Sequence, residues 1–118
     1  MASYKIQRVK GAEGSTVYPY EAAGHYECVT TRLHDPADVN DGKITMGITY
    51  FVPGGRTDFK SNAMESVYYI LEGEMTLKTD DGETVLKAGD SFHCGPGCNK
   101  SVTNTGTTVT QMLVVLIK

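Results

Sequence analysis

The sequence predicts an all-β domain built as a sandwich or barrel of antiparallel strands, and three observations support this fold class. Thr, Val and Ile make up 30 of the 118 residues, and these β-branched types fit a pleated strand. Residues 44–52 (ITMGITYFV) alternate with a period of two, as a half-buried strand does. Turn signals recur every 8–12 residues or so, and no segment keeps a helical period. We therefore expect residues 1–118 to form one all-β domain.

The order of the elements follows from the same signals. Residues 1–25 have no clear period and are expected to form an irregular arm. Turn-forming residues gather in residues 35–42 (DPADVNDG). We expect a strand to end at residues 53–55 (PGG) and a tight turn at residues 72–74 (EGE). Residues 80–82 (DDG) are a hairpin signal. The strands expected between these breaks are 26–34, 44–52, 66–71, 75–79, 83–87, 91–94, 100–104 and 108–118.

Composition narrows the classes of partner. Eleven Lys and Arg against 14 Asp and Glu give a net charge of −3, which argues against nucleic acid or an anionic membrane as the main partner. No apolar run approaches the roughly 18 residues of a membrane span, and the first ten residues lack the apolar core of a signal peptide. Three cysteines fit reduced thiols better than a disulfide framework. We expect a cytoplasmic protein.

Two stretches carry a family resemblance. PGGRTDFKSNAMESVYYILEGE (53–74) places Gly54 and Gly73 at its two ends, and GDSFHCGPGCNKSVTNTG (89–106) supplies Gly89, Gly97 and Asn104. The pair resembles the two motifs of the cupin family, over residues 44–117. The resemblance implies a small jelly-roll β-barrel, and it also implies a homodimer.

The resemblance does not extend to the metal ligands of the family. Their positions fall on Lys60, Asn62, Ser66 and Lys100, and ammonium and amide groups cannot replace the imidazoles and carboxylates that such a site needs. We therefore expect a metal-free cupin with no cofactor.

The same four positions still point toward the barrel, where Tyr68 and Val102 share their parity. Two lysines in one apolar cavity would favour the neutral amine, so that Lys60 or Lys100 could act as a general base or form a Schiff base. Alternatively both remain charged and bind a small anion. In a third interpretation they lie at the rim with their charged ends in water.

Further candidates lie near the second motif and in the N-terminal segment. His93 has the opposite parity to Phe92 and Cys94, so the sequence leaves open which set faces the pocket, and a pocket histidine could be an acid–base group. His25 and His34 could complete an improvised metal site with His93, Cys94 and Cys98, although buried structural roles are commoner. Arg32 could reach the pocket mouth from a neighbouring strand or pair with the acidic loop at 35–41.

Three functions remain open. The first is a metal-free binding protein that holds a small anionic or carbonyl compound in its barrel. Its candidate residues are Asn62, Ser66, Tyr68, Val102 and Arg32, with Lys60 and Lys100. The second is a metal-independent isomerase, lyase or decarboxylase that uses Lys100, Lys60 or His93 as acid or base. The third is a non-catalytic accessory subunit with a closed barrel, because fold alone does not decide function.

Overall fold

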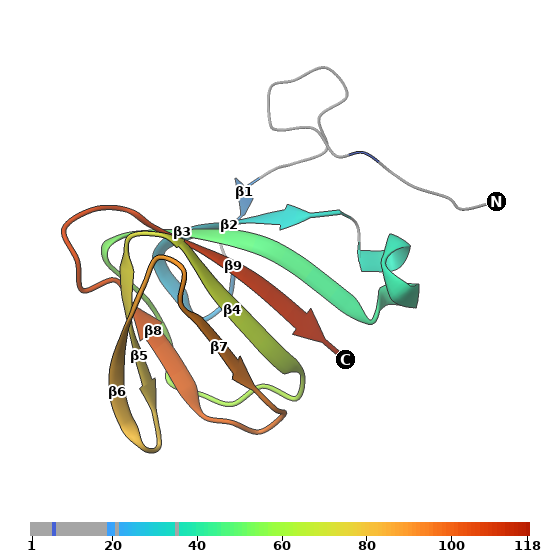
Figure 1. Cartoon of the computed structure of the whole chain (residues 1–118). Helices are drawn as coiled ribbons and strands as arrows, with labels where there is room; N and C mark the ends of the chain where they lie inside the picture. Colours follow the sequence, from blue (N-terminus) through green and yellow to red (C-terminus); the bar gives the residue numbers. More distant parts are fainter. Residues whose placement is uncertain (1–5, 7–18, 21, 35) are drawn as a thin grey trace.

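The computed structural model describes residue 6 and residues 19–20, 22–34 and 36–118. Within these ranges the chain forms strands and two short 3₁₀ turns (Figure 1), and no described helix is long and apolar enough to cross a membrane. The strands are β1 (Pro19–Tyr20), β2 (His25–Leu33), β3 (Ile44–Thr57), β4 (Glu65–Glu72), β5 (Glu74–Thr79), β6 (Gly82–Lys87), β7 (Ser91–Cys94), β8 (Lys100–Thr103) and β9 (Thr110–Ile117). The 3₁₀ turns are η1 (Pro36–Asp38) and η2 (Asn40–Gly42).

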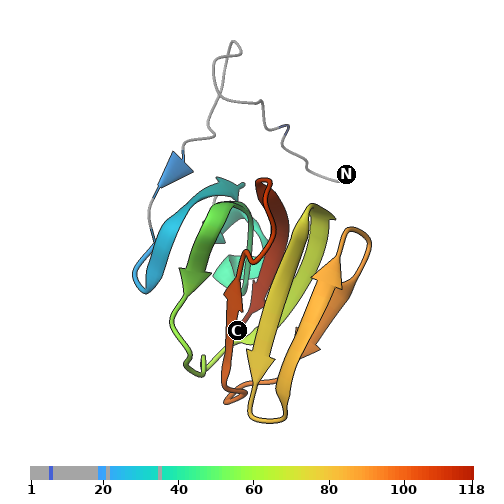
Figure 2. The same ribbon diagram turned by 90° about the vertical axis from the view of Figure 1, so that its left-hand side faces the viewer.

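The strands form a nearly closed antiparallel barrel, which confirms the predicted jelly-roll class. Their hydrogen-bonded order is β6-β5-β8-β3-β9-β4-β7, with β2 added along β3. One layer contains β2, β3, β9, β4 and β7, and the other contains the end of β3 with β8, β5 and β6. In the turned view of Figure 2 the β5–β6 hairpin lies at one side of the barrel and β2 lies at the other.

Strand β3 connects the two layers. Its first part pairs with β9 from Ile44 to Phe51, and its last part pairs with β8 at Arg56. The expectation that residues 53–55 end this strand was wrong, because it continues through them to Thr57. Gly54 takes a positive φ of 87°, and a Cβ atom on Gly55 would come within 2.5 Å of the Glu27 carbonyl oxygen. The two glycines therefore bend the strand instead of stopping it.

The side chain of Asn104 fastens this bend. Its amide nitrogen donates to the carbonyl oxygens of Phe51 at 2.9 Å and Thr108 at 2.8 Å, and its oxygen accepts from the Gly106 N–H at 3.0 Å. The backbone of Asn104 exchanges two further 2.8 Å hydrogen bonds with Gly54 and Gly55. Asn104 is only 1% exposed, so these bonds satisfy polar groups that water does not reach.

The apolar core lies toward β5, β6 and β8. Its buried members are Cys28, Phe51, Ile70, Met75, Leu77, Leu86, Val102 and Met112. The first half of β3 has a different pattern, because its buried side is Gly47, Thr49 and Phe51 while Met46 and Val52 are exposed. Small and polar residues therefore face the interior along part of β3, and the larger apolar ones face outward.

The other expected elements agree with the structure to within a few residues. Asp80 and Asp81 form the two-residue turn of a hairpin in which Thr79 pairs with Gly82. Residues 36–42 form η1 and η2 beyond the ends of β2 and β3 (Figure 1). In the expected irregular arm, Pro19 pairs with Thr31 and Tyr20 with Thr30, whereas most of residues 1–18 lie outside the described residues.

Replacing Asn104 by alanine should lower the free energy of unfolding by about 2–4 kcal/mol, because buried backbone groups lose their partners. Urea unfolding followed by circular dichroism measures this change. The control is Asn99→Ala, since among the described residues the Asn99 amide bonds only to the exposed carboxylate of Asp80. This variant should change stability by no more than about 0.5 kcal/mol. Equal effects of the two substitutions would contradict the role assigned to Asn104.

Candidate ligand-binding site

A cavity of about 150 Å³ opens between the inner faces of β2, β3, β4 and β9. An apolar cavity of about this volume can hold one benzene-sized ring. The lining residues are Ala22, His25, Thr30, Thr45, Met46, Gly47, Thr49, Thr57, Asn62, Tyr68, Met112, Val114 and Leu116.

The cavity exists because the residues along its β2–β3 wall are small. Gly47 has no side chain, and a Cβ atom there would come within 3.2 Å of the Thr30 methyl group. Thr30 and Thr49 are paired across β2 and β3, and both are buried. On the same inner face, Val114 and Leu116 of the neighbouring strand β9, which pair with Gly47 and Thr45, supply apolar surface. The result is a hollow whose lining is hydroxyl-rich over β2 and β3 and hydrocarbon over β9.

Several polar groups of the lining can still form a hydrogen bond with a ligand. The hydroxyl oxygens of Thr30 and Thr49 lie 2.9 Å apart in a mutual hydrogen bond. Thr57 Oγ1 accepts from the Val102 N–H at 3.1 Å, and Asn62 Oδ1 accepts from the Met64 N–H at 2.9 Å. These bonds leave the Thr57 hydroxyl hydrogen and the Asn62 amide hydrogens available, because a hydroxyl both donates and accepts and an amide donates twice.

Tyr68 connects the cavity with the more deeply buried part of the barrel. Its ring lines the cavity and packs edge-on against Phe92 with centroids 6.1 Å apart. Burial raises the pKa of the Tyr68 phenol well above its ordinary value of 10.0, and the nearby thiol of Cys94 raises it further. The phenol therefore stays protonated at neutral pH.

The two predicted lysines lie in different environments. Their backbones form an isolated bridge, with hydrogen bonds of 3.1 Å in each direction. Lys60 is exposed, and its ammonium lies over Gly24, where a Cβ atom would be 2.8 Å from Nζ. Lys100 is only 6% exposed, and its Nζ lies 5.7 Å from the centroid of the Tyr68 ring. Neither lysine is among the residues that line the cavity.

Some of the predicted ligand-binding residues line the cavity and others do not. Asn62 and Tyr68 line the cavity, whereas Val102 is a core residue and Arg32 is an exposed residue of β2. Ser66 is 1% exposed, and its hydroxyl faces the Tyr68 phenol, where it lowers the pKa of that phenol against the larger effect of burial.

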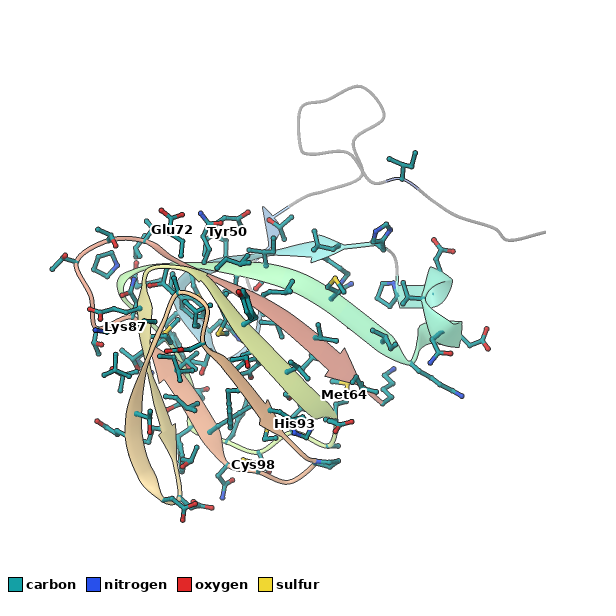
Figure 3. All side chains as sticks on the ribbon, viewed as in Figure 1. Tyr50, Met64, Glu72, Lys87, His93 and Cys98 are labelled. Carbon is teal, nitrogen blue, oxygen red and sulfur yellow. The ribbon has the colours of Figure 1, made fainter. Side chains whose placement is uncertain are left out.

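The orientation of β7 is now defined. Phe92 packs against the core and Cys94 is buried, so His93 faces outward. Its Nε2 lies 2.6 Å from Glu65 Oε2 on the exposed side of β4. Figure 3 places His93 and Cys98 at the same end of the barrel. Desolvation raises the pKa of the Cys98 thiol, and the adjacent Cys94 thiol acts in the same direction.

The histidine that lines the cavity is His25, at the start of β2. From the sequence, His25 was expected only as part of an improvised metal site, because the segment before it has no readable period. The strand predicted for residues 26–34 was a partial indication of its position, since His25 directly precedes that strand.

The donor set does not fit the metal centre known for cupins. No three His, Cys, Asp or Glu side chains in the described part of the chain come together as a possible metal-binding group. The family's ligand positions hold Lys60, Asn62, Ser66 and Lys100, and an ammonium has no lone pair to donate. We therefore derive no chemistry from a metal at these positions.

An antiparallel barrel with a small hollow on the inner face of one layer defines the chain as a small β-barrel protein. Comparison with known proteins identifies the family, because a family model described as "Cupin domain" matches residues 47–116. The chain belongs to the cupin family. It is 33% identical over 85 residues to the protein named "Beta-D-galactosidase Rv1717" from Mycobacterium tuberculosis, and the match covers 72% of this chain and 73% of that protein.

Solved structures agree with the fold. A predicted oxalate decarboxylase from Thermotoga maritima superposes with a TM-score of 0.76 at 25% identity, over 86% of this chain and 93% of that one. The polyketide cyclase RemF from Streptomyces resistomycificus gives a TM-score of 0.79 at 21% identity, over 96% of this chain and 80% of that one. The named activities of these proteins differ, so the shared fold does not select one of them.

The raised pKa of Tyr68 predicts a dependence of stability on alkaline pH. The unfolded chain loses the phenol proton above pH 10.0 while the native chain keeps it. The free energy of unfolding should therefore fall as the pH rises above this value, by at most about 1.4 kcal/mol per pH unit. Urea unfolding of wild type and Tyr68→Phe at several alkaline pH values measures the contribution.

The Tyr68→Phe variant should lose this part of the pH dependence, because it has no phenol at this position. Tyr69→Phe is the matched control, since Tyr69 lies on the other face of the same strand and is 41% exposed. It should keep the wild-type dependence. An unchanged slope in Tyr68→Phe would contradict the assignment.

Proposed function

We propose that this chain is a metal-independent small-molecule-binding cupin whose barrel holds one compact, uncharged, hydroxyl-bearing ring such as a monosaccharide. The observation that carries this proposal is the mixed lining of the cavity. Thr30, Thr49 and Thr57 of β2 and β3 supply hydroxyl-bearing side chains, and Val114 and Leu116 of the neighbouring strand β9 supply hydrocarbon. Binding sites of this kind combine apolar walls with a few placed polar groups.

The size and the charge of the cavity support the same class of ligand. A volume of about 150 Å³ admits one six-membered ring. Both lysines lie outside the lining, and no described lining residue carries a carboxylate. A sugar ring offers hydroxyl groups to the threonines and Asn62 and C–H groups to the apolar wall. The relative named as a β-D-galactosidase is the reason for choosing a galactoside as the first probe.

We propose that the chain binds a sugar but does not hydrolyse a glycosidic bond. Most glycosidases use two carboxyl groups about 5–9.5 Å apart on either side of the scissile bond. The described lining has no such pair, because it contains neither Asp nor Glu. Incubation with p-nitrophenyl β-D-galactopyranoside should therefore release no p-nitrophenol above the buffer rate. Release that persists through repeated purification would replace binding by hydrolysis.

Titration calorimetry and thermal shift with methyl β-D-galactopyranoside test the binding. Wild type should give saturable heat, and its Tm should rise with ligand concentration. Thr49→Val keeps the shape of the side chain but removes a lining hydroxyl, so it should weaken binding about threefold to tenfold. Thr31→Val is the control, because Thr31 is on the opposite face of β2. Absence of a response in wild type to this galactoside and to free galactose would contradict the proposal.

A second candidate ligand is a small anion or carbonyl compound, and buried Lys100 favours it. Lys100 forms no ion pair with any residue that the structure describes, and a buried charge without a partner is costly. A ligand carboxylate or carbonyl that passes Tyr68 would supply that partner. In this alternative the same site could support the metal-independent lyase or isomerase chemistry of a lysine amine.

The two ligand classes can be separated with one lysine variant. If the second candidate holds, pyruvate or phosphate should raise the Tm of wild type but not that of Lys100→Met, and borohydride with pyruvate should add mass to wild type alone. Under the first proposal, Lys100→Met should bind the galactoside within about threefold of wild type, because Lys100 is not in the lining.

We also propose that the chain forms a homodimer through the outer face of the layer that contains β2, β3, β9, β4 and β7. Val29, Val52, Tyr69 and Leu71 on this face are 38–44% exposed, and exposed apolar side chains gathered on one face favour association. Light scattering should give twice the 12.8 kDa chain mass, and Leu71→Glu should give the monomer. Val85→Glu, on β6, is the control. A monomeric wild type at micromolar concentration would refute the dimer.

A further inference from the structure

His25 is the one basic side chain among the described residues that line the cavity. It begins β2 directly after a turn in which its N–H donates to the Ala22 carbonyl at 3.3 Å and Gly24 has a positive φ of 72°. It is paired in register with Thr57, which lines the same cavity. The turn and the pairing therefore place the imidazole at one end of the hydroxyl-bearing wall.

A single hydrogen bond defines the tautomer of the His25 ring. His25 Nδ1 lies 2.9 Å from the Ala23 carbonyl oxygen. A carbonyl oxygen can only accept, so Nδ1 carries the hydrogen in this contact. In the neutral imidazole the other nitrogen, Nε2, then has a free lone pair and can only accept. The backbone contact thus holds the ring in the tautomer that presents an acceptor.

This acceptor complements the other polar groups of the lining. The Asn62 amide and the Thr57 hydroxyl keep hydrogens to donate after their own bonds to the backbone. Lys60 and Asp58 lie beside the turn rather than in the cavity, since a Cβ atom on Gly24 would be 2.8 Å from Lys60 Nζ and 3.1 Å from Asp58 Oδ2. No described carboxylate in the lining competes with His25 as an acceptor.

We propose that His25 Nε2 accepts a hydrogen bond from one hydroxyl group of the ligand and so selects ligands that present a free O–H at this end of the cavity. This role rests on the proposed function, because it names the group of the same site that reads a ligand hydroxyl. A ligand that is O-methylated at this hydroxyl should bind more weakly, since a methyl ether has no hydrogen to donate to Nε2.

Two substitutions of His25 separate the two ring nitrogens. Asparagine places its amide near the position of Nδ1 and can keep the bond to Ala23, but it has nothing at the position of Nε2. Glutamine is longer and can bring its amide oxygen toward that position. Methyl β-D-galactopyranoside should bind His25→Asn about tenfold more weakly than wild type, and His25→Gln should lie within about threefold of wild type.

The tautomer provides a readout that does not depend on any ligand. Long-range ¹H–¹⁵N correlation spectra of the free protein above pH 8 should show the His25 ring protonated at Nδ1. A ring protonated at Nε2 would overturn the inference, and so would His25→Asn binding the galactoside as tightly as wild type does. If wild type itself binds neither the galactoside nor galactose, the proposed function fails and this role fails with it.

Discussion

The fold depends on how two strand crossings between the layers of the barrel are held. Asn104 holds the first crossing, because its amide and backbone bind both sides of the bend in β3. Thr110 holds the second, since its hydroxyl donates to the Glu74 carbonyl at 2.6 Å and accepts from the Glu74 N–H at 3.1 Å. Gly73 lies between β4 and β5 with a φ of 84°, and a Cβ atom there would come within 2.5 Å of Thr110 Oγ1. Side-chain bonds to the backbone thus take the place of sheet pairing where the strands change layers.

These crossings leave the first half of β3 free to line a hollow. Close to the bend, Phe51 belongs to the packed core, but nearer the start of the strand Gly47 and Thr49 face inward. A β3 with large apolar residues at these inner positions would fill the barrel, as close-packed interiors do. The same alternation sends Ile48 and Tyr50 to the outer face. One strand pattern therefore makes both the cavity and the apolar outer surface.

Much of the fold can be predicted from the sequence because its signals are local. The alternation in residues 44–52, the DDG turn and the spacing of the glycines each act over a few residues, and the structure confirms the strands that they indicate. The continuation of β3 through residues 53–55 could not be predicted in this way, because Pro and Gly usually end a strand. The bonds that hold this segment come from Asn104, which lies far away in the sequence.

The site was less accessible to sequence reasoning than the fold. Asn62 was found because the family motif fixes its position, and Tyr68 because it shares the strand parity of Ser66. The motif also pointed to Lys60, whose side chain ends at the rim. His25 depends on a turn without a sequence period and on pairing with Thr57, a contact between distant residues. Cavity lining is a property of packing between strands, and parity within one strand gives only the face on which a side chain lies.

The central claim is that the hollow between β2, β3, β4 and β9 is a ligand site. The most direct measurement is an NMR titration of ¹⁵N-labelled protein with D-galactose, followed at every backbone amide. We expect saturable shifts that are concentrated at Gly47, Thr49, Thr57 and Val114, with a common dissociation constant. Saturable shifts confined to the outer face, or no shifts at these lining residues, would contradict the account.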